Sequence, residues 1–545
     1  MNGEVSGVPL DLLSWLLALS PIVVLLVLLA VRRWKAPQAG PIGLLVATAV
    51  ALIVFRTPLE NLAVAYGKGV WDAIFILFVV WPALLLYRIG DRAGAFDALR
   101  VGIAKFSKND LFLVLAFGWV FASFLQGIAG FGTPIAVVAP LLLALRVKPV
   151  MAVAIPLIGH AWANMFGTLA VGWLATIQVV DLQDATRTAF DSALLLWIPN
   201  LAGAFFIAWL FGRGRAMAHA APMILIISLV HGGGQLVLTL WDPVLSNFLA
   251  ATAGLLLLYP LSRWKRYSEP VGIESRIAAH KGDEIDDAEE EQAEPVMGLG
   301  MALMPYAVLT VASVFALVIG PISDALGQFE IGLGFPTVDT GYGVERAAES
   351  PYSPFAPFTH PGMFLLIAAL AGWIVYRSKG YFKAWGERAD PPRLWTSVVS
   401  DAVPASFAIV SFLVLSKVMD HSGQTETLAL GIEAVTPPVV YAFFATWIGV
   451  LGAFMTSSNT ASNVLFSPLQ QTVANTQGLS ESAIIGAQSA GGAIGNSIAP
   501  ANVVLGTGTT GSVGQEGQVL RTTLPWALAV TVVTGLATVA LTQIA

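Results

Sequence analysis

The stretch Thr456–Asn463 reads T-S-S-N-T-A-S-N, and apolar sequence flanks it on both sides. The two apolar arms, Trp447–Met455 and Val464–Leu469, are each too short to cross a bilayer, which takes about 20 residues. Non-helical backbone at membrane depth survives only inside protein or beside a water-filled cavity. The stretch therefore predicts a re-entrant hairpin near 447–473 whose tip lies beside a cavity.

Outward from this stretch, the chain has the composition of a membrane protein. Its 545 residues are 56% hydrophobic and only 11% charged, whereas a soluble domain carries about 25% charged residues. Apolar runs of span length recur from end to end, as at Leu10–Val31, Val70–Ile89 and Ser192–Phe211. We expect an all-α polytopic membrane protein with roughly 12–14 transmembrane segments, because a β-barrel would show short alternating segments instead.

The positions of the basic residues near the N-terminus indicate whether the first apolar helix stays in the membrane or is cleaved. No Lys or Arg precedes Leu10, whereas Arg32, Arg33 and Lys35 follow the first span. This is the pattern of a retained helix, not of a cleaved signal peptide. We expect a multi-pass protein of the inner (plasma) membrane.

The chain also contains an internal repeat. The offset that pairs Asp72 with Asp401 also pairs Arg88 with Lys417 and Gly94 with Gly423, without a gap. Further along the chain, Thr133 falls opposite Thr460 and Asn164 opposite Asn496, with nearly the same offset. Repeats with interrupted helices are typical of secondary transporters. Basic residues follow the leading helix of the first copy and precede that of the second, which predicts inverted repeats. We interpret the repeated charges as complements of the helix dipoles, near the two membrane faces. The expected regions are N-terminal helices at 1–69, a first repeat at 70–211, connecting helices at 212–398 and a second repeat at 399–545.

Two long polar stretches lie in the connecting region. The segment 262–300 is strongly acidic between Asp283 and Glu294, which is typical of a solvated loop joining two halves. The segment 321–360 is rich in Gly and Pro and too long for a simple turn. We expect it to pack on an outer face.

Each repeat carries two breaks in its apolar sequence. The first repeat has Q-G-I-A-G-F-G-T-P at Gln126–Pro134, in a predicted hairpin near 119–145, and P-L-I-G-H-A-W-A-N-M-F-G at Pro156–Gly167, in a predicted broken helix at 150–175. The second repeat has the hairpin above and Ala487–Asn502, in a predicted broken helix at 482–511. We expect the two tips and two breaks to enclose a small polar solute. The alternative for any single glycine is close helix packing, as in the GxxxG of Gly491 and Gly495.

The candidate substrate-binding residues are small and polar side chains of these breaks. A helix N-terminus presents free N–H groups and a partial positive charge, so it can hold a carboxylate without an arginine. The candidates are Gly130, Gly132, Thr133, His160, Asn164, Ser457, Ser458, Asn459, Thr460, Ser489, Gly491, Gly492 and Asn496.

His160 is the only titratable residue within the four breaks. An imidazole changes charge near physiological pH, so His160 is a candidate proton carrier and substrate ligand. The alternative is a neutral, structural histidine that is satisfied by a neighbouring amide or carbonyl group.

Several other functions are excluded by missing residues. The chain has no cysteine, so it has neither disulfides nor thiolate-bound metals. The segment Gly506–Gly511 spells GxGxxG, but no βαβ unit surrounds it, and no Walker A motif is present. No basic patch is interleaved with aromatic residues, as nucleic-acid binding would require. We expect no cofactor, no metal and no enzymatic activity.

These motifs resemble the L-lactate permease family of the ion transporter superfamily. The resemblance is strongest over Gly452–Gly514, which contains G-A-F-M-T-S-S-N-T-A-S-N and S-A-G-G-A-I-G-N-S-I-A-P-A-N-V, and G-F-G-T-P at Gly130–Pro134 is the corresponding signature of the first half. It implies proton-coupled transport of lactate, glycolate or similar small carboxylates, a scaffold with a moving transport domain, and a homodimer.

This sequence departs from the family pattern at two places. Asn496 stands where the family carries Lys, and Gly159-His160-Ala161 stands where it carries A-N-T. One hypothesis is that His160 restores part of the charge lost at Asn496. The alternatives left open are a sodium-coupled organic-anion carrier and, from another class, an ion channel or a polytopic membrane enzyme.

Overall fold

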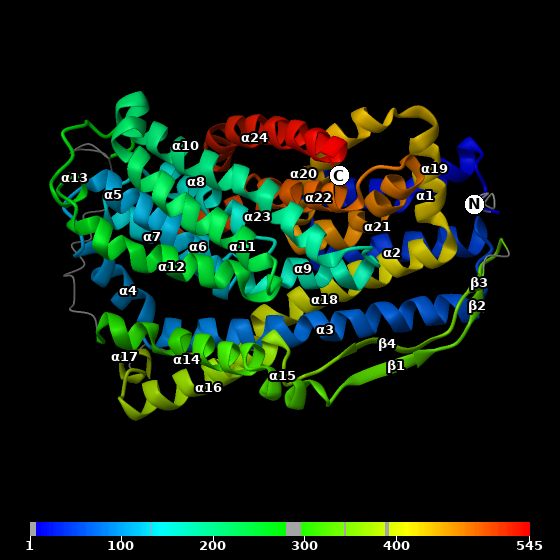
Figure 1. The fold of residues 1–545 in the computed structure, drawn as a ribbon, viewed down its shortest axis with the longest axis horizontal. Coiled ribbons are helices and arrows are strands. Elements are labelled where there is room, and N and C mark those ends of the chain that lie inside the picture. Colours follow the sequence, from blue (N-terminus) through cyan, green and yellow to red (C-terminus); the bar gives the residue numbers. More distant parts are fainter. Residues whose placement is uncertain (1–6, 131, 279–295, 343–344, 387–391, 545) are drawn as a thin grey trace.

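A computed structural model describes residues 7–130, 132–278, 296–342, 345–386 and 392–544. Within this part of the chain, eleven helices are long and apolar enough to cross a bilayer, and one bent pair raises the number to twelve. Most of these helices run along the long axis of the molecule (Figure 1). The chain is therefore a multi-pass helical membrane protein, with fewer separate spans than the upper end of the predicted range. The acidic run 283–294 lies outside the described residues.

The leading helices of the two repeats, α3 (Leu59–Arg92) and α18 (Leu394–Ser422), pack against each other in opposite directions. Arg88 pairs with Asp401 at 2.6 Å, and Lys417 pairs with Asp72 at 3.4 Å. Each acid thus meets the base of the other repeat. The interpretation of these charges as complements of their own helix dipoles was therefore incomplete, because a sequence read one helix at a time contains no contact between helices.

Each of these helices ends in the same way. Gly94 and Gly423 adopt left-handed backbone, with φ of 73° and 85°, which a glycine enters without steric cost. Each glycine starts a short helix, α4 (Ala95–Ala104) or α19 (Gln424–Val435). The sequence repeat is therefore also a repeat of local structure.

The hairpin segments have longer arms than their apolar runs predict. In the first half, α5 (Asp110–Leu115), the π-helical turn η2 (Ala116–Phe121) and α6 (Ala122–Ile128) form one run of 19 residues, buried from Leu111 onward, that leads to α7 (Thr133–Ala144). In the second half, α20 (Pro438–Thr456) and α21 (Asn459–Gln477) have 19 residues each.

The predicted arms were too short because apolar sequence continues before Trp119 and Trp447, and the runs Asp110–Ile128 and Pro438–Thr456 are apolar enough to cross a bilayer. The arm α21 is extended by polar residues, because it and α20 pack against other helices. Polar groups inside them are satisfied by one another, as where Tyr441 Oη donates to Gln470 Oε1 at 2.7 Å. Away from the tips, α7 runs toward one end of the molecule and α21 toward the other (Figure 1). The turn after α7 contacts Ile277, whose carbonyl accepts from Lys148 N–H at 2.8 Å, whereas Asn475 near the end of α21 contacts Gln183 at 3.3 Å.

The two predicted broken helices are both interrupted. In the first half, α8 (Pro149–Gly159) and the 3-10 turn η3 (Ala161–Ala163) precede α9 (Gly167–Val179), and the two spans meet at 55°. Thr168, Leu169 and Ala170 have left-handed backbone at this bend. In the second half, three residues separate α22 (Glu481–Asn496) from α23 (Pro500–Thr509).

Connecting and peripheral helices surround these elements. The helices α10 (Ala185–Ser228), η4 (Leu229–Gly233) and α11 (Gly234–Thr239) follow one another without an intervening loop. Within α10, however, the chain reverses its direction at Gly212 and Arg213. Ser228 Oγ consequently donates to Asn200 Oδ1 at 2.7 Å within α10. The remaining helices are α1 (Leu12–Leu26) with η1 (Val27–Val31), α2 (Ala36–Ile53), α12 (Pro243–Arg263), α13 (Lys265–Ser268), α14 (Leu299–Val318), α15 (Gly320–Gly327), α16 (Pro361–Ser378), α17 (Lys383–Gly386) and α24 (Glu516–Ile544).

The Gly/Pro-rich segment 321–360 adds short strands to a fold predicted to be all-α. Strand β1 (Ile331–Phe335) pairs antiparallel with β4 (Glu349–Phe355), and β2 (Val338–Asp339) pairs with β3 (Glu345–Arg346). This hairpin packs along α3, where Lys68 Nζ lies 2.7 Å from Glu349 Oε1. The turn chemistry of Gly and Pro favours such a hairpin.

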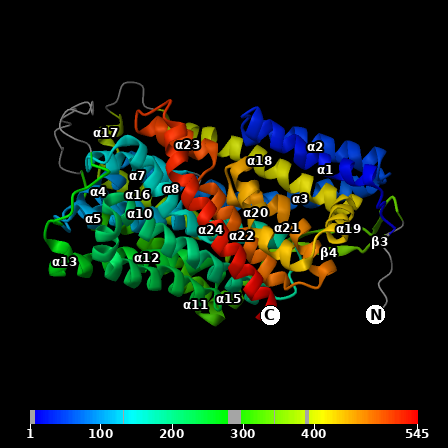
Figure 2. The ribbon, with the colours of Figure 1, turned by 90° about the horizontal axis from the view of Figure 1, so that it is seen from above.

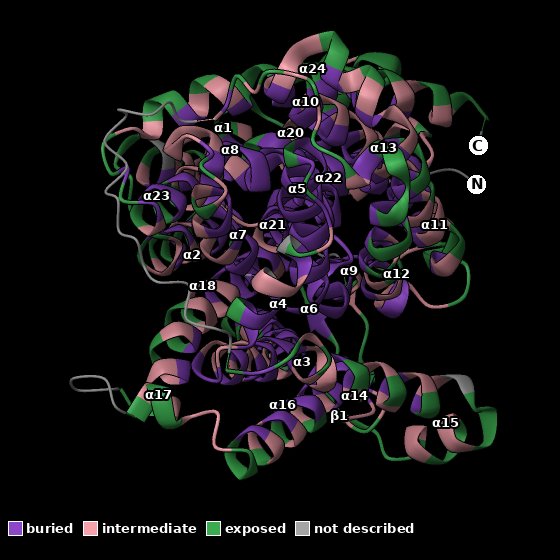
Figure 3. Ribbon diagram, turned by 90° about the vertical axis from the view of Figure 1, so that its left-hand side faces the viewer, coloured by how far each residue is buried: buried purple, intermediate pink, exposed green. Residues whose placement is uncertain are grey.

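The most buried helices belong to the two repeats. Buried residues concentrate on α5, α6, α9, α21 and α22, whereas α1, α15, α16 and α24 expose much of their surface (Figure 3). Seen from above, α24 crosses over α20 and α22, and α2 lies beside α18 (Figure 2). The tips and breaks are therefore held at the centre of the molecule.

Candidate functional site

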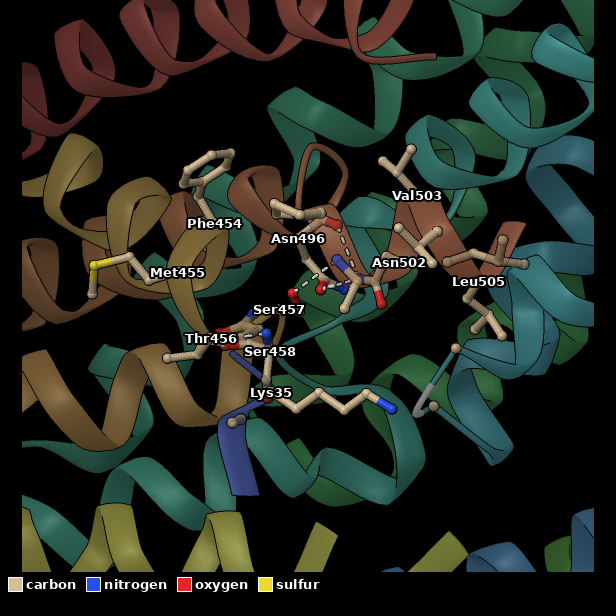
Figure 4. Close-up of a pocket in the computed structure, with 18 of the residues that line it drawn as sticks. Lys35, Phe454, Met455, Thr456, Ser457, Ser458, Asn496, Asn502, Val503 and Leu505 are labelled. Atoms are coloured by element: carbon tan, nitrogen blue, oxygen red, sulfur yellow. Dashed lines mark hydrogen bonds between the residues drawn. The ribbon is translucent and has the colours of Figure 1, made fainter. Parts of the chain in front are cut away.

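A cavity of about 1040 Å³ lies where the two tips and the two breaks meet. Its lining includes both hairpin tips, the bend between α8 and α9, and the gap between α22 and α23. Figure 4 shows the second tip, Ser457 and Ser458, beside the hydrogen-bonded pair Asn496 and Asn502. The predicted residues that line it are Gly130, Gly132, His160, Asn164, Ser457, Ser458, Asn459, Thr460 and Asn496.

The two breaks meet through side-chain amides. Asn496 Nδ2 donates to Asn164 Oδ1 at 3.0 Å, and Asn502 Nδ2 donates to Asn496 Oδ1 at 2.6 Å. Asn164 and Asn496 are the residues that the repeat places opposite each other in sequence. Residues at equivalent positions of the two halves therefore bond to each other at the centre of the site.

The second tip combines a tight turn with a helix start. Ser457 has left-handed backbone with φ of 56°, and Ser458 caps α21 by accepting from Ala461 N–H at 3.2 Å. The N–H groups of Asn459 and Thr460 donate to no acceptor within the described residues. The positive end of the α21 dipole thus opens into the cavity with two free donors.

The first tip is built from backbone. Gly130 N–H donates to Thr168 Oγ1 at 2.7 Å, which ties the tip to the bend of the broken helix. Thr168 Oγ1 also lies 3.5 Å from the carbonyl oxygen of Gln126. The first tip therefore shapes the cavity and offers few side-chain hydrogen-bonding groups to a ligand.

Behind the second tip, two amide oxygens have no donor. Asn459 and Asn463 are both buried, and the Oδ1 atom of each lacks a hydrogen-bond partner among the residues described. A methyl group placed on Gly492 would lie 2.9 Å from Asn459 Oδ1 and 3.5 Å from Asn463 Oδ1, so both oxygens face this glycine. Buried oxygens of this kind normally meet a donor, a water or an ion.

Four predicted residues lie outside the cavity lining: Thr133, Ser489, Gly491 and Gly492. The Ser489 carbonyl accepts from Asn459 Nδ2 at 3.3 Å, so Ser489 lies one layer behind the tip. A methyl group on Gly491 would come within 2.0 Å of the Thr446 carbonyl oxygen, and one on Gly159 equally close to that of Gly118. These two glycines, opposite each other in the repeat, serve close helix packing, which was the alternative interpretation for Gly491.

His160 lines the cavity but is held by its own helix. Its side chain is 2% exposed, and Nδ1–H donates to the carbonyl of Pro156 one turn earlier. This bond leaves Nε2 as the nitrogen available to a ligand. Asn496 makes its side-chain bonds with Asn164 and Asn502, so the lining contains His160 and Asn496 without a direct bond between them.

The sequence interpretation missed the charged residues of the lining, which are Arg33, Lys35, Asp401 and Glu516 in the described part of the chain. Asp401 is paired with Arg88, and Glu516 accepts from Thr507 Oγ1 at 2.9 Å and from Gly514 N–H at 3.0 Å. The Lys35 ammonium makes no hydrogen bond or ion pair with a described residue. Figure 4 shows the Lys35 side chain extended into the pocket near Ser458. In the sequence, Lys35 belongs to the run R-R-W-K after the first span, and such a run indicates only an anchor at the membrane face.

The described residues contain no group of three or more His, Cys, Asp or Glu side chains that could hold a metal ion. The lining instead offers hydroxyls, amides, free N–H groups and the cations Arg33 and Lys35, neither of which forms an ion pair with a described residue. Such a set suits a small polar anion, because it supplies donors and positive charge without nucleophile or acid–base clusters.

The sequence of the chain is similar to those of known permeases. Residues 14–545 match the family model of L-lactate permease. Glycolate permease GlcA of Escherichia coli K12 is 27% identical over 550 residues, covering 96% of this chain and 95% of that protein. L-lactate permease of the same organism is 26% identical over 549 residues, with coverage of 96% and 95%.

Among solved structures, the chain is similar to the Alcanivorax borkumensis YdaH transporter, at 16% identity and a TM-score of 0.42, covering 87% of this chain and 86% of that one. The family model spans nearly the whole sequence, from the first helix to the last residue. The chain therefore belongs to the L-lactate permease family and is a membrane transporter, not an enzyme.

Proposed function

We propose that this chain carries lactate, glycolate or a similar small 2-hydroxy monocarboxylate across the inner membrane by proton symport. The observation that carries the proposal is the convergence, on one cavity, of an unpaired lysine and a helix start with free N–H groups. Two relatives with matching coverage are named for glycolate and for L-lactate transport. Both compounds are small 2-hydroxy acids that ionise at neutral pH.

The carboxylate of the substrate would lie between Lys35 and the start of α21. A carboxylate that leaves water loses strong solvation, and one helix N-terminus supplies only about half a positive charge. The free N–H groups of Asn459 and Thr460 supply directed hydrogen bonds, and Lys35 supplies a whole charge. The amides of Asn164 and Asn502 offer further donors and acceptors to the polar head of the substrate.

The proton would travel with the substrate through His160. Its Nε2 is left free by the bond from Nδ1–H to Pro156. A protonated imidazole in the lining attracts a carboxylate, and loss of that proton weakens the attraction. Binding and release of lactate would then follow the protonation of one residue.

Alternating access would arise from two inverted repeats, each with a re-entrant hairpin. Support comes from the antiparallel α3 and α18, whose ion pairs cross between equivalent positions. The opposite directions of α7 and α21 away from the tips also support it (Figure 1). Exposure of the cavity first to one side and then to the other follows from such symmetry.

A second candidate mechanism is sodium coupling, and the unpartnered oxygens of Asn459 and Asn463 favour it. Sodium ions bind to clustered oxygens near unwound helix ends in transporters. The two oxygens that face Gly492 would form part of such a site. The Asn463→Ala variant would then lose sodium-dependent uptake.

Uptake of radiolabelled lactate into proteoliposomes tests the proposal, with pH and sodium gradients imposed separately. We expect a pH gradient, acidic outside, to drive accumulation, and a sodium gradient alone to give no stimulation. Accumulation that follows only the sodium gradient would select the second mechanism. A single-channel conductance in place of saturable uptake would contradict carrier transport.

The role of Lys35 has its own test with a matched control. Hydrogen bonds to charged groups contribute about 1.5–3 kcal/mol, so Lys35→Gln should raise the KM for lactate by about tenfold or more. Arg32 is exposed, belongs to the same turn and lies outside the lining. Arg32→Gln should therefore leave the KM within about twofold. Equal changes of the KM in the two variants would show that Lys35 acts only as a general surface charge.

A further inference from the structure

We propose that an apolar side pocket beside the second hairpin tip holds the alkyl side chain of the substrate, so that the transporter binds 2-hydroxy monocarboxylates longer than lactate. This inference rests on the proposed function, because it needs the carboxylate and the 2-hydroxyl group in the main cavity. It adds a binding site for the remaining part of the molecule. The ligand class is a straight or branched aliphatic 2-hydroxy acid.

The side pocket lies between the second hairpin and the helices α2, α3, α9 and α18. Its volume is about 110 Å³. A water-sized group takes roughly 30 Å³ in the liquid, so the space suits a short chain of a few carbon atoms. Its walls are Ala36, Ile76, Ala175, Ala405, Ala408, Ile409, Phe412, Leu413, Ala461 and Val464, together with the tip residues Thr456, Ser458 and Thr460.

The side pocket and the main cavity share a border. Ala36, Ala405, Thr456, Ser458 and Thr460 line both spaces. The border therefore carries all the hydroxyl groups of the side pocket, and the wall beyond it is apolar. A molecule that fits both spaces has a polar head and an aliphatic tail.

The hydroxyl groups at the border are not equivalent. Thr456 Oγ1 donates to the Gly452 carbonyl at 2.8 Å, and Ser458 Oγ caps α21. The Thr460 hydroxyl has no hydrogen-bond partner among the described residues. Thr460 is thus free to bind the 2-hydroxyl group at the point where the tail would turn into the apolar pocket.

The small side chains of the wall set the length of tail that fits. Ala36, Ala175, Ala405 and Ala408 each leave room that a larger residue would fill. Burial of one methylene group favours binding by about fourfold in affinity. The expected series therefore improves from glycolate to lactate and to 2-hydroxybutyrate, and reverses once the tail outgrows the pocket.

The test is competition against radiolabelled lactate uptake in proteoliposomes. The competitors are glycolate, 2-hydroxybutyrate, 2-hydroxyvalerate and 2-hydroxyoctanoate, each at several concentrations. We expect 2-hydroxybutyrate to bind about fourfold more tightly than lactate, and 2-hydroxyoctanoate to bind more weakly than 2-hydroxybutyrate. Direct uptake of labelled 2-hydroxybutyrate separates transport from blockade.

Two variants test whether the preference for 2-hydroxybutyrate over lactate arises in the side pocket. Ala408→Leu, or Ala405→Val if the first variant folds poorly, should bring the ratio of the 2-hydroxybutyrate and lactate affinities down to about one. Val403 is on the same helix, is 37% exposed and borders neither space. Val403→Leu should leave the ratio unchanged.

The outcomes separate this inference from the proposed function. A wild-type protein that takes up lactate with no gain for 2-hydroxybutyrate would overturn the side pocket and leave lactate transport standing. A gain that persists in both filled variants would overturn the side pocket as well. Failure of every compound to enter or compete would overturn the proposed function and the inference with it.

Discussion

The two hairpin tips occupy equivalent places and contribute different things. At the first tip, the contact to the rest of the site is made by backbone, through Gly130 N–H and Thr168 Oγ1. At the second tip, Ser457, Ser458 and Asn459 present side chains and a helix start to the same cavity. The two tips therefore share a place in the repeat, while most of the side-chain hydrogen-bonding groups at the tips belong to the second one.

The contrast extends to the packing behind the tips. Gly159 and Gly491, which correspond in the repeat, approach a carbonyl oxygen of the neighbouring helix in the same way. The halves are thus alike where helices must lie close together. They differ where a solute would be bound, which indicates that the packing constraints and the binding constraints act on different residues.

The largest expected effect concerns the direction of the two hairpins. The chain has no native cysteine, so single cysteines at Arg146 and at Asn475 can be labelled without background. An impermeant thiol reagent added to intact cells should label one of them fully and the other only after the membrane is opened. Labelling of both from the same side would remove the inverted-repeat account.

The next effect compares equivalent tip positions. Asn459→Ala removes the bond to the Ser489 carbonyl and frees the tip, so the initial rate of lactate uptake should fall by at least tenfold. Thr133 corresponds to Thr460 and lies outside the lining, so Thr133→Val should change the rate by less than about threefold. Rates are normalised to the amount of reconstituted protein. Wild-type uptake by the Asn459→Ala variant would remove this tip from the site.

A smaller and symmetric effect is expected at the packing glycines. Gly159→Ala and Gly491→Ala each force a methyl group against a backbone carbonyl, and overpacking of this kind costs about 1–3 kcal/mol. Both variants should lower the thermal unfolding midpoint in detergent by a few degrees, to a similar extent. A large loss for one variant and none for the other would show that the halves are not packed alike.

The smallest expected effect concerns His160. His160→Gln keeps the hydrogen-bonding capacity but cannot carry a charge. In the wild-type protein, affinity for lactate should fall as the pH rises and the imidazole loses its proton, whereas the variant should show a flatter pH profile at similar maximal uptake. An unchanged profile with full gradient-driven accumulation would assign the histidine to structure alone.

Much of the fold followed from local sequence signals. The Gly, Ser and Asn runs predicted where helices break, and the repeat predicted that Asn164 and Asn496 are counterparts. The hairpin arm lengths were missed because the apolar runs were ended at Trp119 and Trp447, although apolar sequence continues before both residues. The strands were missed because the segment 321–360 was interpreted only as a long Gly/Pro-rich loop. Lys35 and the crossed ion pairs were missed because they depend on contacts between distant helices, such as α3 with α18.

The central claim is that the cavity between the tips binds a small carboxylate. A single cysteine at Ser457 lies in its lining, so the rate of its reaction with a small thiol reagent reports occupancy of the cavity. We predict that saturating lactate slows this reaction several-fold, that neutral lactamide does not, and that a cysteine at Asn475 is unaffected by either. A Ser457→Cys protein that still transports lactate but reacts at the same rate with and without it would contradict the claim.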